Sequence, residues 1–325
     1  MYVKSLELKD FRNSNELMVH FYTGVNIFYG DNAQGKTNIL EGLYLCGTTK
    51  SHKGSKDREI IRLGSEEAHI RMFIERNGVT HKIDMHLKKN KPKGVAIDGI
   101  PIRKSTELFG LIHMVFFSPE DLGIIKNGPN SRRRFMDIEL CQLDKMYLHN
   151  LSCYNKILLQ RNNLLKQIKT KNDELYSTLS IWDEQLTLYG EQIIQRRQLF
   201  ISQLNKIIEE IHWKLTNQKE ELKIMYEPNV SFEMYREKLT KNTERDISTK
   251  TTNVGPHRDD IAYIIGDKDI RKYGSQGQQR TTALSLKLAE IELVKQVTKD
   301  QPILLLDDVL SELDRSRQTQ LLDRI

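Results

Sequence analysis

Hydrophobic residues in the first third of the chain recur with the two-residue period of β-strands. The alternation runs through residues 70–74 and 81–87, and an Asp-Gly pair at Asp98 between two apolar triplets predicts a tight hairpin. An apolar run over residues 24–29 ends at a glycine and predicts a buried strand. A helix is expected soon after it, over residues 37–46. The pattern predicts one strand–helix unit followed by an antiparallel β section.

The middle of the chain changes to helical spacing. From about Asp144 to Leu215 there is no proline and one glycine, and apolar residues recur every three or four positions. A polar break at 169–173 separates two runs, and the second has an a/d heptad seam from Leu175 to Ile211. Two long antiparallel helices with a short connection are expected. Two interpretations stay open: a helical subdomain whose seam packs on the body, and a projecting arm.

The last third of the chain returns to a mixed α/β pattern. A short apolar run at 303–306 predicts a buried strand. A similar run at 114–117, before the helical region, predicts another. The other elements expected here are a polar loop over residues 240–255, a hairpin at 261–270, and helices over 276–297 and 315–325. Strands and helices that alternate in this way indicate an α/β fold.

Composition narrows the class of protein only slightly. The 325 residues include 50 Lys or Arg and 44 Asp or Glu, a formal net charge of +6, which permits binding to nucleic acid. The 38% hydrophobic share excludes collagen-like and low-complexity classes. Cys46, Cys141 and Cys153 are too scattered for a disulfide framework or a zinc site, which favours a reduced, cytoplasmic setting. An apolar run of 18 residues is absent, so the sequence excludes a transmembrane helix.

The most specific local motif is a phosphate-binding loop of the form GxxxxGK[ST] between the expected strand and helix. Its glycines let backbone N–H groups face phosphate oxygens, and the helix N-terminus adds positive potential. We predict that Lys36 binds the β- and γ-phosphates and that the Thr37 hydroxyl binds Mg²⁺. The residues assigned to the nucleotide are Gly30, Asp31, Asn32, Ala33, Gln34, Gly35, Lys36, Thr37 and Asn38.

Two adjacent carboxylates, Asp307 and Asp308, follow the expected strand at 303–306. A buried strand that ends in carboxylates delivers them to the mouth of a parallel sheet, beside the phosphate loop. Asp307 is predicted to hold Mg²⁺, and Asp308 to orient or deprotonate the attacking water. With Lys36 they form the predicted catalytic set. Taken alone, an Asp pair after a strand is often a helix N-cap or a solvated turn.

A third motif, Gly274-Ser275-Gln276-Gly277-Gln278-Gln279-Arg280, precedes a long expected helix and resembles the signature of ABC-type ATPases. Residues 311–314, Ser-Glu-Leu-Asp, resemble the D-loop of the same superfamily. The resemblance implies that Ser275, Gly277 and Gln278 bind the γ-phosphate held by a second subunit, and hence an ATP-bridged homodimer. The alternative for Ser275 is a plain helix N-cap.

The order of these motifs resembles the SMC-related ABC-type ATPases of DNA repair and, within them, the RecF family of bacterial recombination mediators. The resemblance spans nearly the whole chain, and its most particular stretches are Ser118-Pro119-Glu120-Asp121 and Gly255-Pro256-His257-Arg258-Asp259-Asp260. It implies an ABC-type P-loop ATPase head of the α/β class, with a mixed sheet, an antiparallel β section and an inserted antiparallel helical arm.

The resemblance also implies a division into three parts: residues 1–143 as the N-terminal part of the head, 144–220 as the helical arm, and 221–325 as the C-terminal part of the head. The ABC pattern continues after the D-loop helix with a further strand and a switch loop. Because the sequence ends at Ile325, we expect it to be truncated at the C-terminus.

The function that the resemblance implies is an ATP-dependent dimer that binds single-strand/duplex DNA without sequence preference. Its implied partners are RecO- and RecR-like mediators, with which it helps to load the RecA recombinase in gap repair, replication and the SOS response. ATP and Mg²⁺ are the implied cofactors, and slow hydrolysis acts as a release timer. Arg12 matches a basic position near the nucleotide in related repair ATPases. Asp308 fits slow hydrolysis, because it is one methylene shorter than the Glu usual in transporter and SMC heads.

Three basic groups are candidates for contacts with DNA phosphates. They are the run 88–93, Arg132 to Arg134, and the set Lys50, Lys53, Lys56 and Arg58. Each run alone is more often a solvated face, and Arg132 to Arg134 could instead pair with acidic residues inside the head. His257 is expected to be structural or to lie near the dimer face.

Other functions compete with this interpretation. One is an SMC-like structural ATPase of chromosome maintenance, which the short arm of about 72 residues, roughly 50 Å long as two helices, makes less favourable. A transporter cassette conflicts with the long helical insertion and the lack of a membrane-contacting apolar segment. A P-loop enzyme for a small metabolite would leave the signature motif unexplained.

Overall fold

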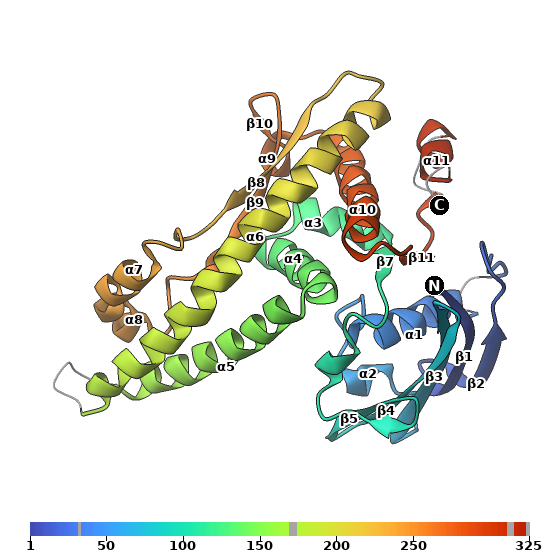
Figure 1. Cartoon of the computed structure of the whole chain (residues 1–325), viewed down its shortest axis with the longest axis horizontal. Coiled ribbons are helices and arrows are strands. Elements are labelled where there is room, and N and C mark those ends of the chain that lie inside the picture. Colours follow the sequence, from blue (N-terminus) through green and yellow to red (C-terminus); the bar gives the residue numbers. More distant parts are fainter. Residues whose placement is uncertain (32–33, 169–173, 311–314, 323–325) are drawn as a thin grey trace. The chain divides into compact units, whose positions relative to one another are not determined.

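The computed structural model describes residues 1–31, 34–168, 174–310 and 315–322 (Figure 1). The chain divides into two compact units, each with its own contacts. Unit 1 comprises Met1–Pro119 and Val294–Ile325, and unit 2 comprises Glu120–Leu293. The three-part division expected from the resemblance stays a prediction.

Unit 1 is built on a six-stranded antiparallel sheet in the order β2-β1-β3-β4-β5-β6. Alternate side chains of its long strands are fully buried, Leu6, Ile70 and Ile83 among them, so one face of the sheet packs into the core. The strands are β1 (Tyr2–Phe11), β2 (Ser14–His20), β3 (Glu67–Arg76), β4 (Val79–Lys88), β5 (Lys91–Ile97) and β6 (Ile100–Pro101). The predicted antiparallel section and the Asp98 hairpin between β5 and β6 match this sheet.

Helix α1 (Lys36–Thr48) packs on this sheet and on a second, parallel pair of strands (Figure 1). That pair joins β7 (Met114–Phe117) to β11 (Ile303–Leu306), with Leu306 opposite Phe117. The Asp307 N–H continues the ladder by donating to the Phe117 carbonyl at 2.9 Å. The parallel pair therefore sets the position of the carboxylates that follow β11. Unit 1 also contains α2 (Asp57–Ile60), a 3₁₀ turn at Ser105–Leu108 and α11 (Arg315–Leu322).

The buried strand predicted over residues 24–29 is wrong for this structure. The segment has no strand assignment, and Val25, Ile27 and Tyr29 are 74%, 79% and 91% exposed. Among the apolar side chains of this segment only Phe28 is partly buried, edge-on to Phe21 with ring centroids 6.0 Å apart. A strand needs a neighbour for its N–H and C=O groups, and no strand of the described residues pairs with this run.

Unit 2 is mainly helical, with a small antiparallel sheet in the order β10-β9-β8. Its strands are β8 (Leu222–Glu227), β9 (Asp260–Ile265) and β10 (Lys268–Asp269). Its helices are α3 (Leu122–Lys126), α4 (Pro129–Leu143), α5 (Lys145–Gln167), α6 (Leu179–Leu215), α7 (Tyr235–Lys241), α8 (Thr243–Thr249), α9 (Ile270–Tyr273) and α10 (Gln276–Thr298), with 3₁₀ turns at Pro119–Asp121, Glu174–Thr178 and Pro256–Arg258. The hairpin and the long helix expected after residue 260 are present as β9–β10 and α10.

Helices α5 and α6 form the expected antiparallel pair. The Asp144 carboxylate caps α5 and also accepts from Arg196 Nε at 2.7 Å, while further along α5 the Asn150 amide donates to Gln192. The second half of α6 is also covered, because its Asn205 accepts the Ile224 N–H of β8 at 2.6 Å. The seam of α6 is thus buried within unit 2, which favours the helical-subdomain interpretation over a projecting arm.

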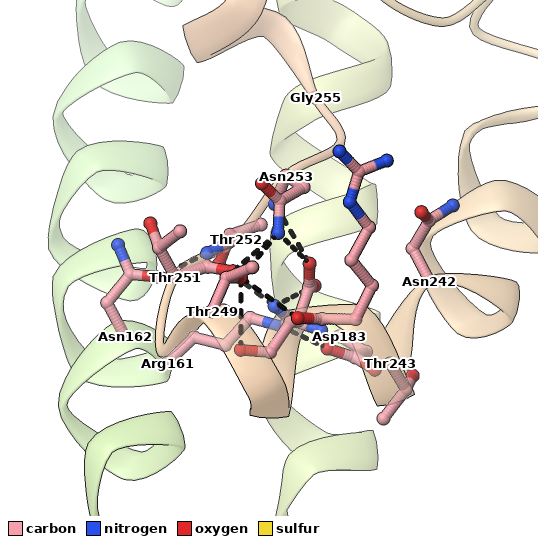
Figure 2. Close-up of polar contacts among 12 residues, drawn as sticks. Arg161, Asn162, Asp183, Asn242, Thr243, Thr249, Thr251, Thr252, Asn253 and Gly255 are labelled. Carbon is pink, nitrogen blue, oxygen red and sulfur yellow. Dashed lines mark hydrogen bonds and ion pairs between the residues drawn. The ribbon is translucent and has the colours of Figure 1, made fainter.

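The polar loop expected over residues 240–255 contains the end of α7 and all of α8, so that expectation is corrected. A buried network holds these short helices to α5 and α6 (Figure 2). Arg161, fully buried, donates to Asp183 at 2.6 Å, to Asp246 at 2.7 Å and to the Thr252 hydroxyl at 2.9 Å. The Asp246 carboxylate of α8 is thus held by an arginine 85 positions away, a partner that the local pattern of this polar segment does not reveal.

Candidate nucleotide-binding site

The phosphate loop leads directly into α1. Gly30 and Gly35 have φ values of 140° and 93°, conformations that other residues rarely adopt, and Gly35 is the N-cap of α1. The Lys36 ammonium lies over the loop and donates to the carbonyls of Gly30 at 2.5 Å and Asp31 at 2.8 Å. Asn32 and Ala33 lie outside the described residues, and Gln34 is exposed. Lys36 therefore places a positive charge at the mouth of the loop, where a phosphate would be bound.

Thr37 and Asp307 meet at this helix end. The Thr37 hydroxyl donates to Asp307 Oδ1 at 3.0 Å, and the next residue, Asp308, is exposed with a left-handed φ of 53°. A hydroxyl beside a carboxylate offers the hard oxygen donors that Mg²⁺ prefers, so these two side chains fit a Mg²⁺ ion bound together with phosphates. The structure brings together the loop and the carboxylates that the sequence assigned to one site.

Arg12 stands beside the loop, held by a buried carboxylate on α1. Its Nε and NH2 groups donate to Glu41 at 2.8 and 2.7 Å, and NH2 also donates to the Ser55 hydroxyl at 2.7 Å. Glu41 is completely buried and accepts from Ser51 as well. Burial alone would raise the pKa of Glu41, but the hydrogen bonds from Arg12 and Ser51 lower it below its ordinary value. A charged Glu41 thus fixes the guanidinium in place.

These groups surround one cavity of about 730 Å³ in unit 1, the size of a pocket for a small organic ligand. Its lining residues are Arg12, Asn13, Gly35, Lys36, Thr37, Asn38, Arg58, Glu59, Ile61 and Leu63. Asn38 donates to Asn13 across the mouth of the loop at 2.5 Å. The lining of the cavity combines cationic and amide groups with the apolar side chains of Ile61 and Leu63. A nucleotide needs both kinds of group, because its phosphates are charged and the faces of its base are apolar.

Sequence reasoning missed Glu41, Arg58 and Leu63. The sequence does mark Glu41 as a candidate for a buried ion pair, because it is the single acidic residue in the otherwise apolar run of α1. Arg58 was considered only as a DNA contact, and its place at the cavity depends on the turn around α2. Leu63 is 97% exposed and has no local pattern that would mark it.

The signature residues lie in unit 2, at the start of α10. Ser275 is exposed, its hydroxyl accepts from the Gln278 N–H at 3.2 Å, and the Gln278 side chain accepts the Ser275 N–H at 3.0 Å. This reciprocal pair is the capping-box arrangement, so Ser275 is the N-cap of α10, which is compatible with both interpretations of the motif. Gly277 is exposed beside it. The D-loop candidates at 311–314 lie outside the described residues.

Two residues of the stretch 255–260, His257 and Asp260, make structural contacts in unit 2. Arg132 is 4% exposed and donates to Asp260 at 2.5 and 3.0 Å, so its assignment to DNA is wrong and its pairing with an acidic residue is confirmed. His257 is also structural: it contacts the Tyr154 hydroxyl and the Thr252 carbonyl, and burial lowers the pKa of His257 to about 4.

A glycine-rich loop at a helix N-terminus, with a carboxylate-ended strand beside its threonine, is the arrangement of a P-loop nucleotide-binding protein. The RecF/RecN/SMC N-terminal domain model matches residues 2–325. The chain is 67% identical to the DNA replication and repair protein RecF of Lachnoclostridium phytofermentans and 59% identical to that of Lachnospira eligens, covering all of this chain and 90% of each relative. The chain belongs to the RecF family.

Solved structures agree with this assignment. The recombination mediator protein RecF bound to ATP, described as part of the RecFOR pathway, aligns with a TM-score of 0.94 and 37% identity over 99% of this chain and 89% of that one. A second RecF structure, with an ATP analogue, aligns with a TM-score of 0.92 at the same identity. The α/β ATPase-head fold is therefore confirmed. The described helices include none both long enough and apolar enough to cross a membrane.

Proposed function

We propose that this chain is a cytoplasmic ATP-gated DNA-binding switch, a homodimer when it binds ATP, that works with RecO- and RecR-like mediators in recombinational repair. The observation that carries the proposal is the Thr37–Asp307 contact at the edge of a cavity that also holds Lys36 and Arg12. Phosphates would bind at the loop, with Lys36 turned from the loop carbonyls toward them. Bound Mg²⁺ would neutralise phosphate charge between the oxygens of Thr37 and Asp307.

Dimerisation is proposed from the exposed start of α10. Ser275 and Gly277 are exposed, and the 23-residue α10 directs its N-terminal N–H groups at this surface. A γ-phosphate held in one copy would bind these groups of a second copy. Nucleotide binding would then be linked to dimer formation, because each phosphate group contributes to the affinity between the two copies.

Slow hydrolysis is proposed from Asp308. Its carboxylate follows directly after the residue proposed to hold Mg²⁺, which places it to orient or deprotonate a water molecule. Its side chain is one methylene shorter than a glutamate and reaches less far from the backbone. Hydrolysis would therefore time the release of the dimer rather than perform mechanical work.

The DNA-contacting surface is proposed at the cationic side chains of residues 50–58 in unit 1. Lys50, Lys53 and Lys56 are exposed, and none of them has an ion pair within the described residues, whereas Arg58 lines the nucleotide cavity. The run at 88–93 differs, because Lys88, Lys89 and Lys93 each pair with a carboxylate. Unpaired cations bind phosphates without first breaking an ion pair, so segment 50–58 is favoured.

The switch is tested by fluorescence anisotropy of a gapped DNA duplex with ATP, ADP or no nucleotide, together with sizing of the protein. We expect ATP alone to give a dimer and tighter DNA binding, and both Lys36→Met and Ser275→Arg to abolish that gain. Lys241→Met is the matched control for loss of an exposed lysine, and it should still dimerise and keep the gain in DNA binding. DNA binding that ignores the nucleotide in the wild type would contradict the proposal.

The DNA surface is tested by the triple variant Lys50→Gln, Lys53→Gln, Lys56→Gln. Its control removes the same three charges at exposed lysines that already pair with carboxylates: Lys89, Lys214 and Lys241. We expect the first triple to lower the slope of log affinity against log salt by up to about 3, and the control to leave it nearly unchanged. Equal losses in the two triples would show that net charge alone, and not this segment, determines binding.

A further inference from the structure

The outer face of the large sheet in unit 1 carries a cluster of three potential metal ligands. Glu67 and His69 lie on β3 and His86 on β4, and one ligand atom from each lies within 4.8 Å of the other two. His86 Nε2 is 3.0 Å from Glu67 Oε2, and His69 Nε2 is 3.6 Å from Glu67 Oε1. None of these residues belongs to the nucleotide site, and the family assignment gives them no role.

Strand register explains why the three side chains meet. His69 and His86 are direct cross-strand partners, and Glu67 is two residues before His69, so all three project from the same face. The two imidazole rings stack with centroids 3.9 Å apart and planes at 22°. Beyond His86, the partner on β5 is Gly94, which has no side chain to cover this end of the cluster. The space beside His86 is thus left open.

The polar atoms of the cluster are arranged for a cation. His86 Nε2 is shielded from solvent and, among the described residues, meets no partner in hydrogen-bond geometry despite the nearby carboxylate. The Glu67 carboxylate lies between two groups, His86 Nε2 at 3.0 Å and Lys88 Nζ at 3.2 Å. Two imidazoles and one carboxylate are a donor set of Zn²⁺, with a water molecule as fourth ligand. We propose that Glu67, His69 and His86 form a zinc-binding site that links β3 to β4.

Two lysines place positive charge near this cluster, and that charge disfavours a bound cation. Lys88 pairs with Glu67 at 3.2 Å, and Lys9 is the β1 neighbour of His69 in the strand register. Lys88 is half-exposed and flexible, so its ammonium can leave Glu67 when a divalent ion replaces it. Zn²⁺ and the Lys88 ammonium therefore compete for the same carboxylate, and removal of the lysine should favour the metal.

The test uses the full, tag-free chain, dialysed against EDTA and kept in excess Mg²⁺ without nucleotide, and titrated with Zn²⁺ by calorimetry. We expect one Zn²⁺ per chain in the wild type. His69→Ala and His86→Ala each remove a direct ligand, and should weaken binding by at least the roughly 10- to 100-fold that loss of an outer-shell partner costs. Lys88→Gln should bind Zn²⁺ several-fold more tightly. Co²⁺ absorption should report the same loss in both histidine variants.

Matched controls separate this site from other ligands. His81→Ala removes a histidine that pairs only with Asp98 in its described contacts, and it should leave Zn²⁺ binding unchanged. Cys153→Ser removes a thiol 3.6 Å from His149 on α5, and should also have no effect. Absence of stoichiometric Zn²⁺, survival of binding in His86→Ala, or its loss in Cys153→Ser would each overturn the assignment. Thermal unfolding in EDTA checks that the variants fold.

Discussion

The Thr37 hydroxyl and the Asp307 carboxylate lie 3.0 Å apart although 270 positions separate them in the chain. Thr37 is positioned by the start of α1, and Asp307 by the pairing of β11 with β7. The two ends of the chain therefore build one site, which is complete only when unit 1 has folded around both of them.

The Thr37–Asp307 pair leads to a prediction about Mg²⁺. Asp307→Asn removes a charged oxygen ligand and should weaken ATP binding in Mg²⁺ at least roughly ten-fold, with little effect in EDTA. Asp308→Asn should keep the affinity and lose about a hundred-fold or more in hydrolysis, since it removes only the general base. Nucleotide titration and phosphate-release assays measure both effects. Wild-type Mg²⁺ dependence in Asp307→Asn would refute the metal assignment.

The Arg12–Glu41 pair predicts a pH-dependent stability. Because the pKa of Glu41 is lowered in the folded state, the pair stabilises the fold fully above about pH 4.5, and this contribution is lost as pH falls through the lower folded value. Glu41→Gln should cost about 1.5–3 kcal/mol at pH 7. Chemical denaturation of both proteins should show the difference shrink as pH falls below about 4.5 and level off below the lowered folded pKa, where Glu41 is neutral in both states. A constant difference down to pH 2 would contradict this account.

The Arg161 network predicts a large effect from one substitution. Arg161→Met would leave the buried Asp246 carboxylate and the partly buried Asp183 carboxylate without their cation, which should destabilise the fold by about 3–5 kcal/mol. Lys241→Gln is the control, because its pair with Glu237 is exposed and should cost about 0.3–0.5 kcal/mol. Equilibrium unfolding by circular dichroism compares them. Similar losses for the two variants would mean that burial does not determine the strength of the Arg161 pair.

Gly255 lies where the structure leaves no room for a side chain. Its φ is 138°, and a Cβ at this position would lie 2.5 Å from the Tyr154 hydroxyl and 2.6 Å from that of Tyr235. Strain and overpacking together should make Gly255→Ala cost about 2–5 kcal/mol. Gly266 also has a positive φ, of 57°, but nothing within 4 Å of a Cβ, so Gly266→Ala should cost only about 1–2 kcal/mol. Thermal or chemical unfolding ranks the pair, and the reverse order would refute the steric argument.

Several features of this protein could be predicted from local sequence because their cause is local. The phosphate loop requires glycines followed by Lys36 and Thr37, and the heptad spacing after Leu175 requires a long helix, α6. The apolar run before Asp307 requires a buried strand, β11. Each of these signals consists of residues that are close together in the chain, so the pattern of side chains is enough to recognise it.

Other features depend on partners that no local pattern identifies. The apolar run at 24–29 pairs with no strand in the part of the chain that the structure describes, so its composition does not produce a ladder. Arg132, one of a basic run, becomes a buried structural residue because Asp260, 128 positions away, lies against it. Arg12 is fixed by Glu41, a carboxylate that the sequence shows only as an isolated charge on an apolar helix.

The sequence by itself determined the family, the phosphate loop, the Asp307 strand and the long helices, because those depend on residue type and spacing. Only the tertiary structure decided which charges are paired, which apolar residues remain exposed, and that His69 and His86 stack beside Glu67. The physical reason is that pairing and burial are set by strand register and by contacts between segments far apart in the chain. The basic run at 88–93, for example, is a candidate DNA contact in the sequence, but in the structure three of its lysines are paired with carboxylates.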